Sequence, residues 1–306
     1  MVEGSYQIKM PVPFSPGGEA VTVVAEVGTA VASGRGLKPG DIVIVNGVPF
    51  QEEAVVDGGR VFGPLPPDTD PLNAPPLSSY NTALLALRDR AELQPGESVL
   101  VLGAAGAVGI TAVELSKRVL GASRVVAACS SEEKIALCKA MGADDAINYS
   151  DMSPTEFREA LRTAFPNGVD VVYDPVGGEL AEPCVRALAN YGRYVVIGFA
   201  SGGADAAGAI PQLPANLFLL KNAKLVGSGL TEWVNTRGKG QPLTDMINEV
   251  IQLSAEGRIR SRATPFAFDE LPEAFRALRE RRVVGMAVLT TQHYANSAWG
   301  GEASKL

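Results

Sequence analysis

The stretch Ser98-Val-Leu-Val-Leu-Gly-Ala-Ala-Gly-Ala-Val-Gly-Ile-Thr-Ala-Val-Glu-Leu-Ser-Lys-Arg-Val-Leu-Gly121 decides the fold. Its start is apolar and follows a Pro95-Gly96 turn, which predicts a buried strand over 98–102. Glycine and alanine then predict a tight turn. Apolar residues recur at helical spacing after the turn, so we expect a helix over 107–120. Parallel α/β sheets are built from strand–turn–helix units of this kind.

The glycine turn predicts a phosphate-binding site. Free backbone N–H groups and the positive end of the helix dipole converge there, which suits a pyrophosphate. Gly106 would let phosphates approach the backbone, and Gly109 would let the helix pack on the strand. Ala104 occupies the place of the first glycine in the generic G-x-G-x-x-G pattern. A tight turn without a ligand is therefore the alternative interpretation.

Composition narrows the class of protein. The chain has 306 residues, of which 46% are hydrophobic and 20% charged, which is typical of a globular protein with room for two domains. A net charge of −7 argues against a nucleic-acid or membrane-surface role, and we see no apolar run of membrane-spanning length and no secretory signal. The three scattered cysteines are expected to be reduced, with no metal spacing among them.

The one histidine, His293, lies in the C-terminal tail. This placement argues against a Ser-His-Asp triad, a histidine general base and most zinc sites, so we expect no metal. The predicted chemistry therefore needs little side-chain acid–base catalysis. Hydride transfer fits, because a cofactor carries the reaction and the protein supplies the geometry.

Strand and helix patterns alternate through most of the chain, which predicts an α/β protein with a doubly wound parallel sheet. Before a proline-rich connector over 64–76, we expect three strands, over 20–27, 41–45 and 53–56. Further strands are predicted over 98–102, 124–129, 145–148, 169–173, 193–198, 223–228, 263–268 and 285–290. Helices are predicted over 80–93, 107–120, 131–141, 153–165, 179–190, 214–221, 242–256 and 270–281.

The end of the second strand of the alternating region indicates which dinucleotide would bind. NAD-binding proteins place an Asp or Glu there for the ribose 2′-hydroxyl, whereas this strand ends in Cys129-Ser130-Ser131. Ser130 and Lys134 would suit a 2′-phosphate, which predicts NADPH as the cofactor. The alternative for Lys134 is an ordinary solvated helix residue.

A set of motifs in order resembles the zinc-free quinone oxidoreductases (zeta-crystallin-like) of the medium-chain dehydrogenase/reductase superfamily. The resemblance runs from about residue 4 to residue 290. The motifs are Tyr6-Gln-Ile-Lys9, Pro13-Phe-Ser-Pro-Gly-Gly-Glu19, Gly40-Asp41, Leu102-Gly-Ala-Ala-Gly-Ala-Val-Gly109, Ser130-Ser-Glu-Glu-Lys134, Asn148-Tyr-Ser150, Tyr173-Asp-Pro-Val-Gly-Gly178, Val196-Ile-Gly-Phe-Ala-Ser201, and the stretches 216–222 and 285–290.

The resemblance implies a Rossmann domain over 79–263, a partial GroES-like β-rich domain over 1–78 and 264–290, and a mobile tail over 291–306. It implies no catalytic side chain: the protein's part in catalysis is positioning only, and Thr82 lies near the nicotinamide. The implied NADPH-binding residues are Thr82, Gly106, Ala107, Val108, Gly109, Ser130, Lys134, Tyr149, Val176, Gly177, Gly198, Phe199 and Ala200. Core packing is the alternative role for the Tyr149 and Phe199 rings.

The chain also departs from the resembling family. Gly17-Gly18-Glu19 stands where zinc relatives carry Gly-His-Glu, and no four-cysteine lobe follows, so the resemblance implies no zinc. Ala107 replaces a glycine and Met286 a lysine. Family members also carry strands that precede the Tyr6 region, and we expect this chain to lack them, together with one wall of the substrate cleft.

Three functions are compatible with these patterns. The first is hydride transfer from NADPH to a quinone. The second is reduction of an α,β-unsaturated carbonyl or enoyl thioester, and the third is NADPH binding without turnover.

The resemblance implies a homodimer through the edge strand over 223–228. The final tripeptide Ser304-Lys305-Leu306 matches a peroxisomal import signal read by a receptor, with the cytosol as the alternative location.

Overall fold

The computed structural model describes residues 11, 13–31, 36–202, 210–297 and 299. These residues fall into two compact units. The first spans 79–239, and the second combines the described residues of 10–78 and 240–306. The helix predicted over 242–256 as part of the dinucleotide-binding domain forms over Gln241–Ala255 and groups with the second unit. We describe each unit by itself.

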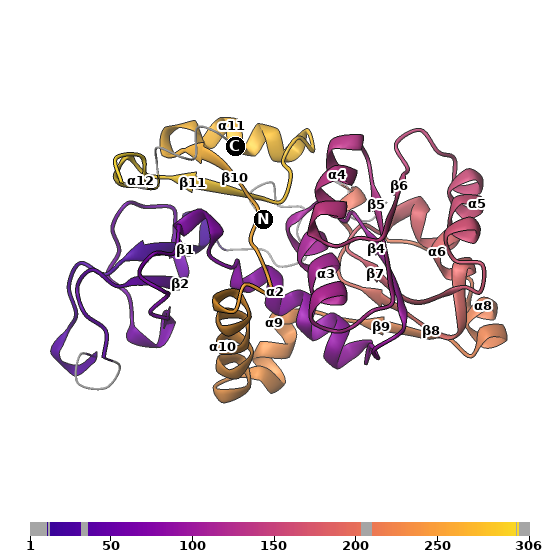
Figure 1. Cartoon of the computed structure of the whole chain (residues 1–306), viewed down its shortest axis with the longest axis horizontal. Helices are drawn as coiled ribbons and strands as arrows, with labels where there is room; N and C mark the ends of the chain where they lie inside the picture. Colours follow the sequence, from indigo (N-terminus) through magenta and orange to yellow (C-terminus); the bar gives the residue numbers. More distant parts are fainter. Residues whose placement is uncertain (1–10, 12, 32–35, 203–209, 298, 300–306) are drawn as a thin grey trace. The chain divides into compact units, whose positions relative to one another are not determined.

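The first unit contains a six-stranded parallel sheet with the strand order β6-β5-β4-β7-β8-β9. Figure 1 shows α3 and α4 on one side of this sheet and α5, α6 and α8 on the other. The strands are β4 Ser98–Leu102, β5 Arg124–Cys129, β6 Asp145–Asn148, β7 Val169–Asp174, β8 Leu188–Val196 and β9 Lys224–Gly227. The helices are α2 Leu77–Leu84, α3 Ala107–Arg118, α4 Glu132–Met141, α5 Pro154–Ala164, α6 Ala181–Ala187, α8 Ala215–Lys221 and α9 Leu230–Trp233.

Burial explains why the central strands form where they do. Residues 99–102 of β4 are fully buried, because helices cover both faces of the sheet and every position must be apolar. Phe157 and Leu161 of α5 pack against this core from one side. The doubly wound Rossmann sheet predicted from the sequence is therefore confirmed.

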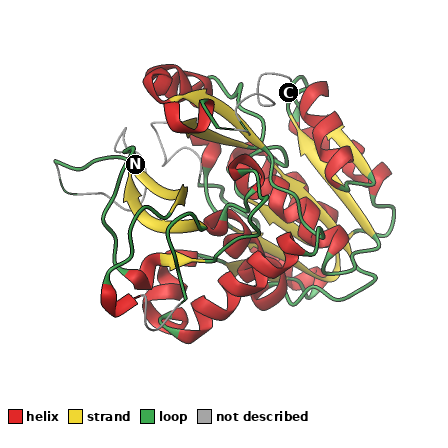
Figure 2. Cartoon of the chain, turned by 60° about the vertical axis from the view of Figure 1, so that its left-hand side comes forward, coloured by secondary structure: helices red, strands yellow, loops and turns green. Residues whose placement is uncertain are grey.

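The second unit contains short strands. Figure 2 draws the strands of the chain in yellow and its helices in red. Its antiparallel sheet has the order β1-β2-β3, formed by Gly17–Val23, Ile42–Pro49 and Val61–Phe62. A parallel pair joins β10 Ala263–Ala267 and β11 Met286–Thr290. The helices of this unit are α10 Gln241–Ala255, α11 Leu271–Arg279 and α12 Gln292–Ala295.

Two expectations about the second unit were wrong. The segment over 53–56 is not a strand: Val55 is fully exposed, and the third strand forms instead where buried Val61 pairs with Val45. Part of the tail is ordered, because residues 292–295 form α12 and the Tyr294 hydroxyl donates to Asp70 at 3.2 Å. The tripeptide 304–306 lies outside the described residues.

Other elements extend or replace the predicted ones. The helix expected over 80–93 is α2 followed by a π-helical segment, Leu85–Arg90. A second π-helical segment, Val234–Gly238, follows α9, and neither was predicted. Short 3₁₀ turns occur at Gly58–Arg60, Pro71–Asn73, Gly178–Leu180, Ala200–Gly202 and Phe268–Glu270. Of the helices that the structure describes, none has the length and apolar character needed to cross a membrane.

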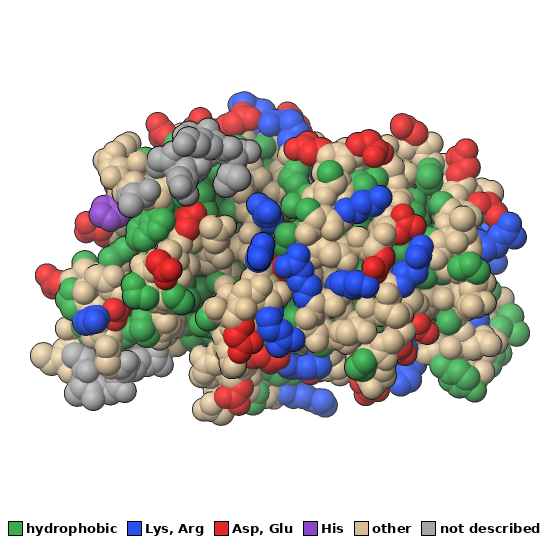
Figure 3. Space-filling model, in the orientation of Figure 1, with side chains coloured by type: hydrophobic (Ala, Val, Ile, Leu, Met, Phe, Trp, Pro, Cys, Tyr) green, Lys and Arg blue, Asp and Glu red, His purple; other side chains and the backbone are tan. Residues whose placement is uncertain are grey.

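Charged side chains on the face drawn in Figure 3 lie among side chains of opposite sign. On α3, Lys117 pairs with Asp144 at 2.7 Å, and Arg118 pairs with the buried carboxylate of Glu114 at 3.3 Å. These basic groups are therefore partly neutralised by neighbours.

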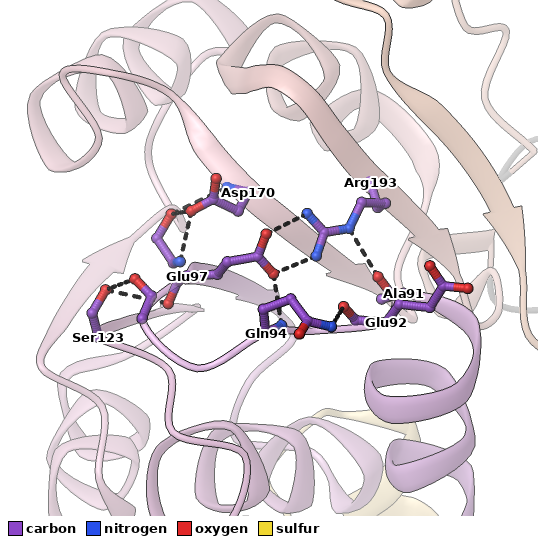
Figure 4. Close-up of polar contacts among 9 residues, drawn as sticks. Ala91, Glu92, Gln94, Glu97, Ser123, Asp170 and Arg193 are labelled. Atoms are coloured by element: carbon purple, nitrogen blue, oxygen red, sulfur yellow. Dashed lines mark hydrogen bonds and ion pairs between the residues drawn. The ribbon is translucent and has the colours of Figure 1, made fainter.

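A partly buried ion pair lies at the end of the sheet where β4 begins (Figure 4). The guanidinium of Arg193 donates to both carboxylate oxygens of Glu97, and its Nε donates to the Ala91 carbonyl at 2.8 Å. Glu97 also accepts from the Gln94 N–H at 2.8 Å. The pair ties Arg193, in the second half of β8, to the turn before β4. Hydrogen bonds from Arg193 and the Gln94 N–H outweigh partial burial and hold the pKa of Glu97 below its usual value.

We expect Arg193→Leu to lower the free energy of unfolding by about 3 kcal/mol, since it leaves a partly buried carboxylate unpaired. Affinity for the predicted dinucleotide should not change, because the pair lies near the amino end of β4, whereas open parallel sheets bind ligands at the carboxyl ends of their strands. Chemical denaturation and calorimetry measure the two effects. Arg186→Leu removes an exposed pair with Glu182 and serves as the control, with an expected cost below about 1 kcal/mol. Equal costs for the two variants would contradict the assignment.

Candidate cofactor-binding site

The turn after β4 has the geometry that the glycine pattern predicts. Gly103 adopts a positive φ of 54°, and the Gly106 N–H donates to the Gly103 carbonyl at 3.0 Å. A Cβ added to Gly109 would lie 2.3 Å from the Gly103 carbonyl oxygen and 2.8 Å from Ala104 Cα. Only glycine therefore allows α3 to start this close to the strand.

The N-terminus of α3 is open for a ligand. Gly106 is the N-cap and brings no side-chain hydrogen bond to the first N–H groups of the helix. Gly106 is exposed, and Ala107 and Val108 are half-buried. The first N–H groups of a helix have no partner within it, so an anion placed here would accept from them.

The neighbouring strand β5 ends beside two groups suited to a phosphate. The Lys134 ammonium donates to the Ser130 hydroxyl at 3.2 Å, and both residues are half-buried. The Ser131 hydroxyl caps α4 by accepting from the Lys134 N–H at 3.3 Å. Residues 129–131 contain no carboxylate. The structure thus brings Ser130 and Lys134 together, as the sequence predicted.

Tyr149 follows β6, the next strand along the edge. Its N–H donates to the Cys129 carbonyl at 2.9 Å, which places it beside the end of β5. Its ring makes an edge contact with Phe157, with centroids 6.1 Å apart. The ring is therefore partly used for core packing, the alternative role considered for it, and it stays half-buried.

The ends of β7 and β8 form the other side of the site. The Ala200 N–H donates to the Pro175 carbonyl at 3.0 Å, and the Ser201 N–H donates to the Val176 carbonyl at 3.0 Å. These bonds hold the predicted residues Gly198, Phe199 and Ala200 next to Val176 and Gly177. A Cβ on Gly103 would lie 2.8 Å from Val176 Cγ2, so this segment also contacts the turn after β4.

Asp174, at the end of β7, organises this side and was given no role from the sequence. Its Oδ1 accepts from the N–H groups of Val176 at 2.7 Å and Gly177 at 2.8 Å, and its Oδ2 accepts from the Tyr194 hydroxyl. Its backbone carbonyl accepts from the Ile197 N–H at 2.8 Å. Burial raises the pKa of Asp174 although its hydrogen bonds oppose the shift.

Thr82 lies on α2, which is held to α3 by buried polar contacts. The Tyr80 hydroxyl donates to Glu114 at 2.6 Å, and the Thr111 hydroxyl donates to the Ser79 carbonyl at 3.2 Å. Thr82 itself is half-buried. It comes from a helix, whereas the other predicted residues follow strand ends or begin α3.

The residues present fit a dinucleotide. The predicted residues outside α2 follow the carboxyl ends of β4, β5, β6, β7 and β8, and the strand order reverses between β4 and β7. Ligands of open α/β sheets bind at this switch point. The buried Ser201 hydroxyl has no hydrogen-bond partner within the described structure, so a polar ligand group would satisfy it.

Comparisons with known proteins agree with this geometry. Residues 107–256 match the family model described as "Zinc-binding dehydrogenase". The bovine quinone oxidoreductase-like protein 2 is 36% identical over 94% of this chain and 79% of its own length. The chain belongs to the medium-chain dehydrogenase/reductase superfamily. It is an oxidoreductase of that superfamily with the quinone oxidoreductase-like 2 proteins among its relatives.

Two further comparisons extend this placement in the superfamily. Bovine prostaglandin reductase-3 is 35% identical over 90% of this chain and 72% of its own length. The solved structure of a mycobacterial protein complexed with NADPH has a TM-score of 0.75 and is 25% identical, covering 92% of this chain and 84% of that one.

The superfamily includes zinc enzymes, and the matching model is named for them. Within the described residues, no group of three or more His, Cys, Asp or Glu side chains is placed to hold a metal ion. Cys129, Cys138 and Cys184 are free and buried in the first unit.

Proposed function

We propose that the protein transfers hydride from NADPH to a quinone. One observation supports NADPH as the cofactor. The N-terminus of α3 is open, the Ser130–Lys134 pair follows the end of the neighbouring strand β5, and residues 129–131 at that strand end contain no carboxylate. The NADPH complex of the mycobacterial neighbour and the names of the closely matching relatives support the proposal.

NADPH, when bound, supplies the hydride. The chain's own residues would hold and orient it: the N-terminus of α3 would bind the pyrophosphate, Ser130 and Lys134 would bind the 2′-phosphate, and the loop over 198–200 would hold the nicotinamide. Catalysis then rests on positioning and on exclusion of water, with no side-chain acid or base.

The test is the loss of NADPH absorbance in the presence of simple ortho- and para-quinones, with α,β-unsaturated ketones and enoyl thioesters in parallel. Faster turnover of quinones supports the proposal. A clear preference for enones would instead favour reduction of α,β-unsaturated carbonyls as the function, a candidate that the similarity to prostaglandin reductase-3 supports. NADPH binding without oxidation by any acceptor would reject both in favour of a binding protein.

The choice between NADPH and NADH should depend on Lys134. We expect Lys134→Ala to weaken NADPH binding about tenfold and to leave NADH binding unchanged, since only NADPH presents a phosphate to the ammonium group. Calorimetry with both cofactors measures the effect. Lys139→Ala is the matched control, because Lys139 is exposed in the last turn of the same helix. Equal losses for both cofactors would contradict the assignment.

We also propose a homodimer formed through β9. This strand is an edge of the six-stranded sheet, and three apolar side chains near it are more than half exposed: Leu219 at 77%, Leu220 at 73% and Leu225 at 54%. An unpaired edge with apolar neighbours favours pairing with a second copy. A mass of one chain per particle in sedimentation would reject this proposal.

We propose a peroxisomal location from the C-terminal tripeptide over 304–306, which matches the import signal. We expect deletion of Leu306 from a fluorescent fusion to return the protein to the cytosol, because the receptor reads the complete tripeptide. Fluorescence microscopy beside a peroxisomal marker measures this, with the full-length fusion as control. An unchanged distribution would contradict the proposal.

A further inference from the structure

Two cysteines contact each other beneath the phosphate turn. Cys129 is the last residue of β5 and Cys138 lies on α4, and their sulfur atoms are 3.4 Å apart. Both side chains are buried, with exposures of 2% and 0%. Cys184, the third cysteine, lies on α6 in a different part of the core.

The surroundings make the two thiols unequal. The hydrogen bond between the two sulfur atoms lowers the pKa of Cys129. Burial opposes this shift, and the N–H groups of Ala105 and Ala104 and the charge of Lys134 reinforce it. The same hydrogen bond, together with burial, raises the pKa of Cys138. Cys129 is therefore the nucleophile of the pair, since the thiolate is the reactive form.

The position of Cys129 links it to both phosphate-binding elements. Cys129 directly follows Ala128, whose carbonyl accepts from the Ala104 N–H of the turn after β4 at 3.1 Å. It directly precedes Ser130, and its partner Cys138 lies one helical turn beyond Lys134 on α4. A movement of these sulfur atoms would therefore displace the turn and the Ser130–Lys134 pair.

We propose that Cys129 and Cys138 form a reversible disulfide when a peroxide oxidises them, and that this disulfide weakens NADPH binding. The Cys129 sulfur attacks a peroxide oxygen, the O–O bond breaks, and a sulfenic acid and one water form. The Cys138 sulfur then attacks the Cys129 sulfur, forming the S–S bond and releasing a second water. Two thiols are oxidised and one hydrogen peroxide is reduced, and both thiol protons end in water.

The bond would change the site because a disulfide needs a sulfur separation of about 2.05 Å. The two sulfur atoms must therefore approach from their 3.4 Å contact. This moves the end of β5, which is bonded to the turn through the Ala128 carbonyl, and draws α4 toward β5. The helix that carries Lys134 and the turn that meets the pyrophosphate both shift, which lowers the affinity for a bound dinucleotide. This second step rests on the proposed NADPH binding.

Disulfide mapping tests the first step without reference to the cofactor. The full chain is treated with hydrogen peroxide, its remaining thiols are alkylated, and tryptic peptides are analysed by mass spectrometry without reduction. We expect peptides 125–134 and 135–139 to be joined, Cys184 to remain alkylated, and dithiothreitol to reverse the link. Alkylation of both Cys129 and Cys138 after peroxide, or a link that includes Cys184, would overturn the proposal.

Calorimetry with NADPH tests the second step. The oxidised protein should bind at least tenfold more weakly than the reduced protein. Cys129→Ala lacks the sulfur that attacks the peroxide, so after peroxide treatment it should bind like its own untreated form. Cys184→Ala should behave like the wild type, and thermal unfolding of the reduced variants checks that they fold. Unchanged affinity in the linked protein overturns the coupling. Absence of binding in the reduced wild type overturns the proposed function, whereas the mapping still decides the disulfide.

Discussion

Gly109→Ala should lower the free energy of unfolding by about 3 kcal/mol. The new Cβ would lie 2.3 Å from the Gly103 carbonyl oxygen and 2.8 Å from Ala104 Cα. Both are backbone atoms of the turn between β4 and α3, so no side chain can move aside to make room. The helix must shift away from the sheet, and NADPH binding should be lost with it. Denaturant unfolding and calorimetry measure the two effects.

Gly106→Ala is the matched control for this clash. A Cβ at Gly106 meets only the Gly103 carbonyl oxygen, at an ordinary contact distance of 3.4 Å. We therefore expect a change in unfolding free energy of less than about 1 kcal/mol. NADPH affinity should nevertheless fall about tenfold or more, because the methyl group occupies the space where phosphates approach the exposed backbone. Wild-type affinity in Gly106→Ala would exclude this turn as the pyrophosphate site, and wild-type stability in Gly109→Ala would contradict the packing role.

The parallel sheet could be predicted because burial on both faces leaves a continuous apolar run in the sequence. Residues 98–102 and 124–129 show that run directly, and the structure places strands over both ranges. The glycine turn between β4 and α3 could also be predicted, since a close approach of backbones admits few residue types. Local patterns of this kind need no knowledge of distant neighbours.

The errors occurred where a distant partner decides the structure. Residues 53–56 have the composition of a strand but find no neighbouring strand, whereas the two-residue strand Val61–Phe62 is too short to show a pattern and forms through pairing with β2. The tail over 292–295 looked polar and mobile, yet the Tyr294 hydroxyl reaches Asp70, which is 224 residues away in sequence.

The difference between local motifs and distant partners also explains which site residues could be predicted from the sequence. The glycines of the turn and the Ser130–Lys134 pair stand within short motifs. Asp174 lies in a quoted motif as well, but its role depends on Tyr194, which belongs to the next strand. The contact between Cys129 and Cys138 depends on how α4 packs against β5, and their spacing in the sequence gives no signal of it.

Asp174→Ala should be strongly destabilising and should also weaken NADPH binding. It removes the acceptor for the N–H groups of Val176 and Gly177 and for the Tyr194 hydroxyl. Two buried donors and one partly buried donor lose their partner, at an expected total of about 3 kcal/mol or more. The loop that holds Val176 against Gly103 then loses its anchor, so calorimetry should show a weaker affinity for NADPH, whereas denaturation measures the stability.

Asp174→Asn separates the loss of hydrogen bonds from the loss of charge. The amide oxygen still accepts from Val176 and Gly177, and the amide N–H can donate to the Tyr194 oxygen, so the loop and the NADPH affinity should be preserved. Because burial raises the pKa of Asp174 in the folded protein, the folded state holds the carboxyl proton more tightly than the unfolded state does. The stability from this group is therefore complete below the unfolded pKa, near 4, and is lost as the pH rises through the folded pKa.

As the pH rises from acidic to neutral, the wild type should therefore lose free energy of unfolding relative to Asp174→Asn, because the carboxyl group titrates and the amide does not. Denaturant unfolding at a series of pH values from about 4 to 7 measures this difference. A shift in favour of the wild type would mean that the three hydrogen bonds outweigh burial. In that case Asp174 would be a stabilising anion under the switch point, and its charge would be available to repel a phosphate placed at the neighbouring turn.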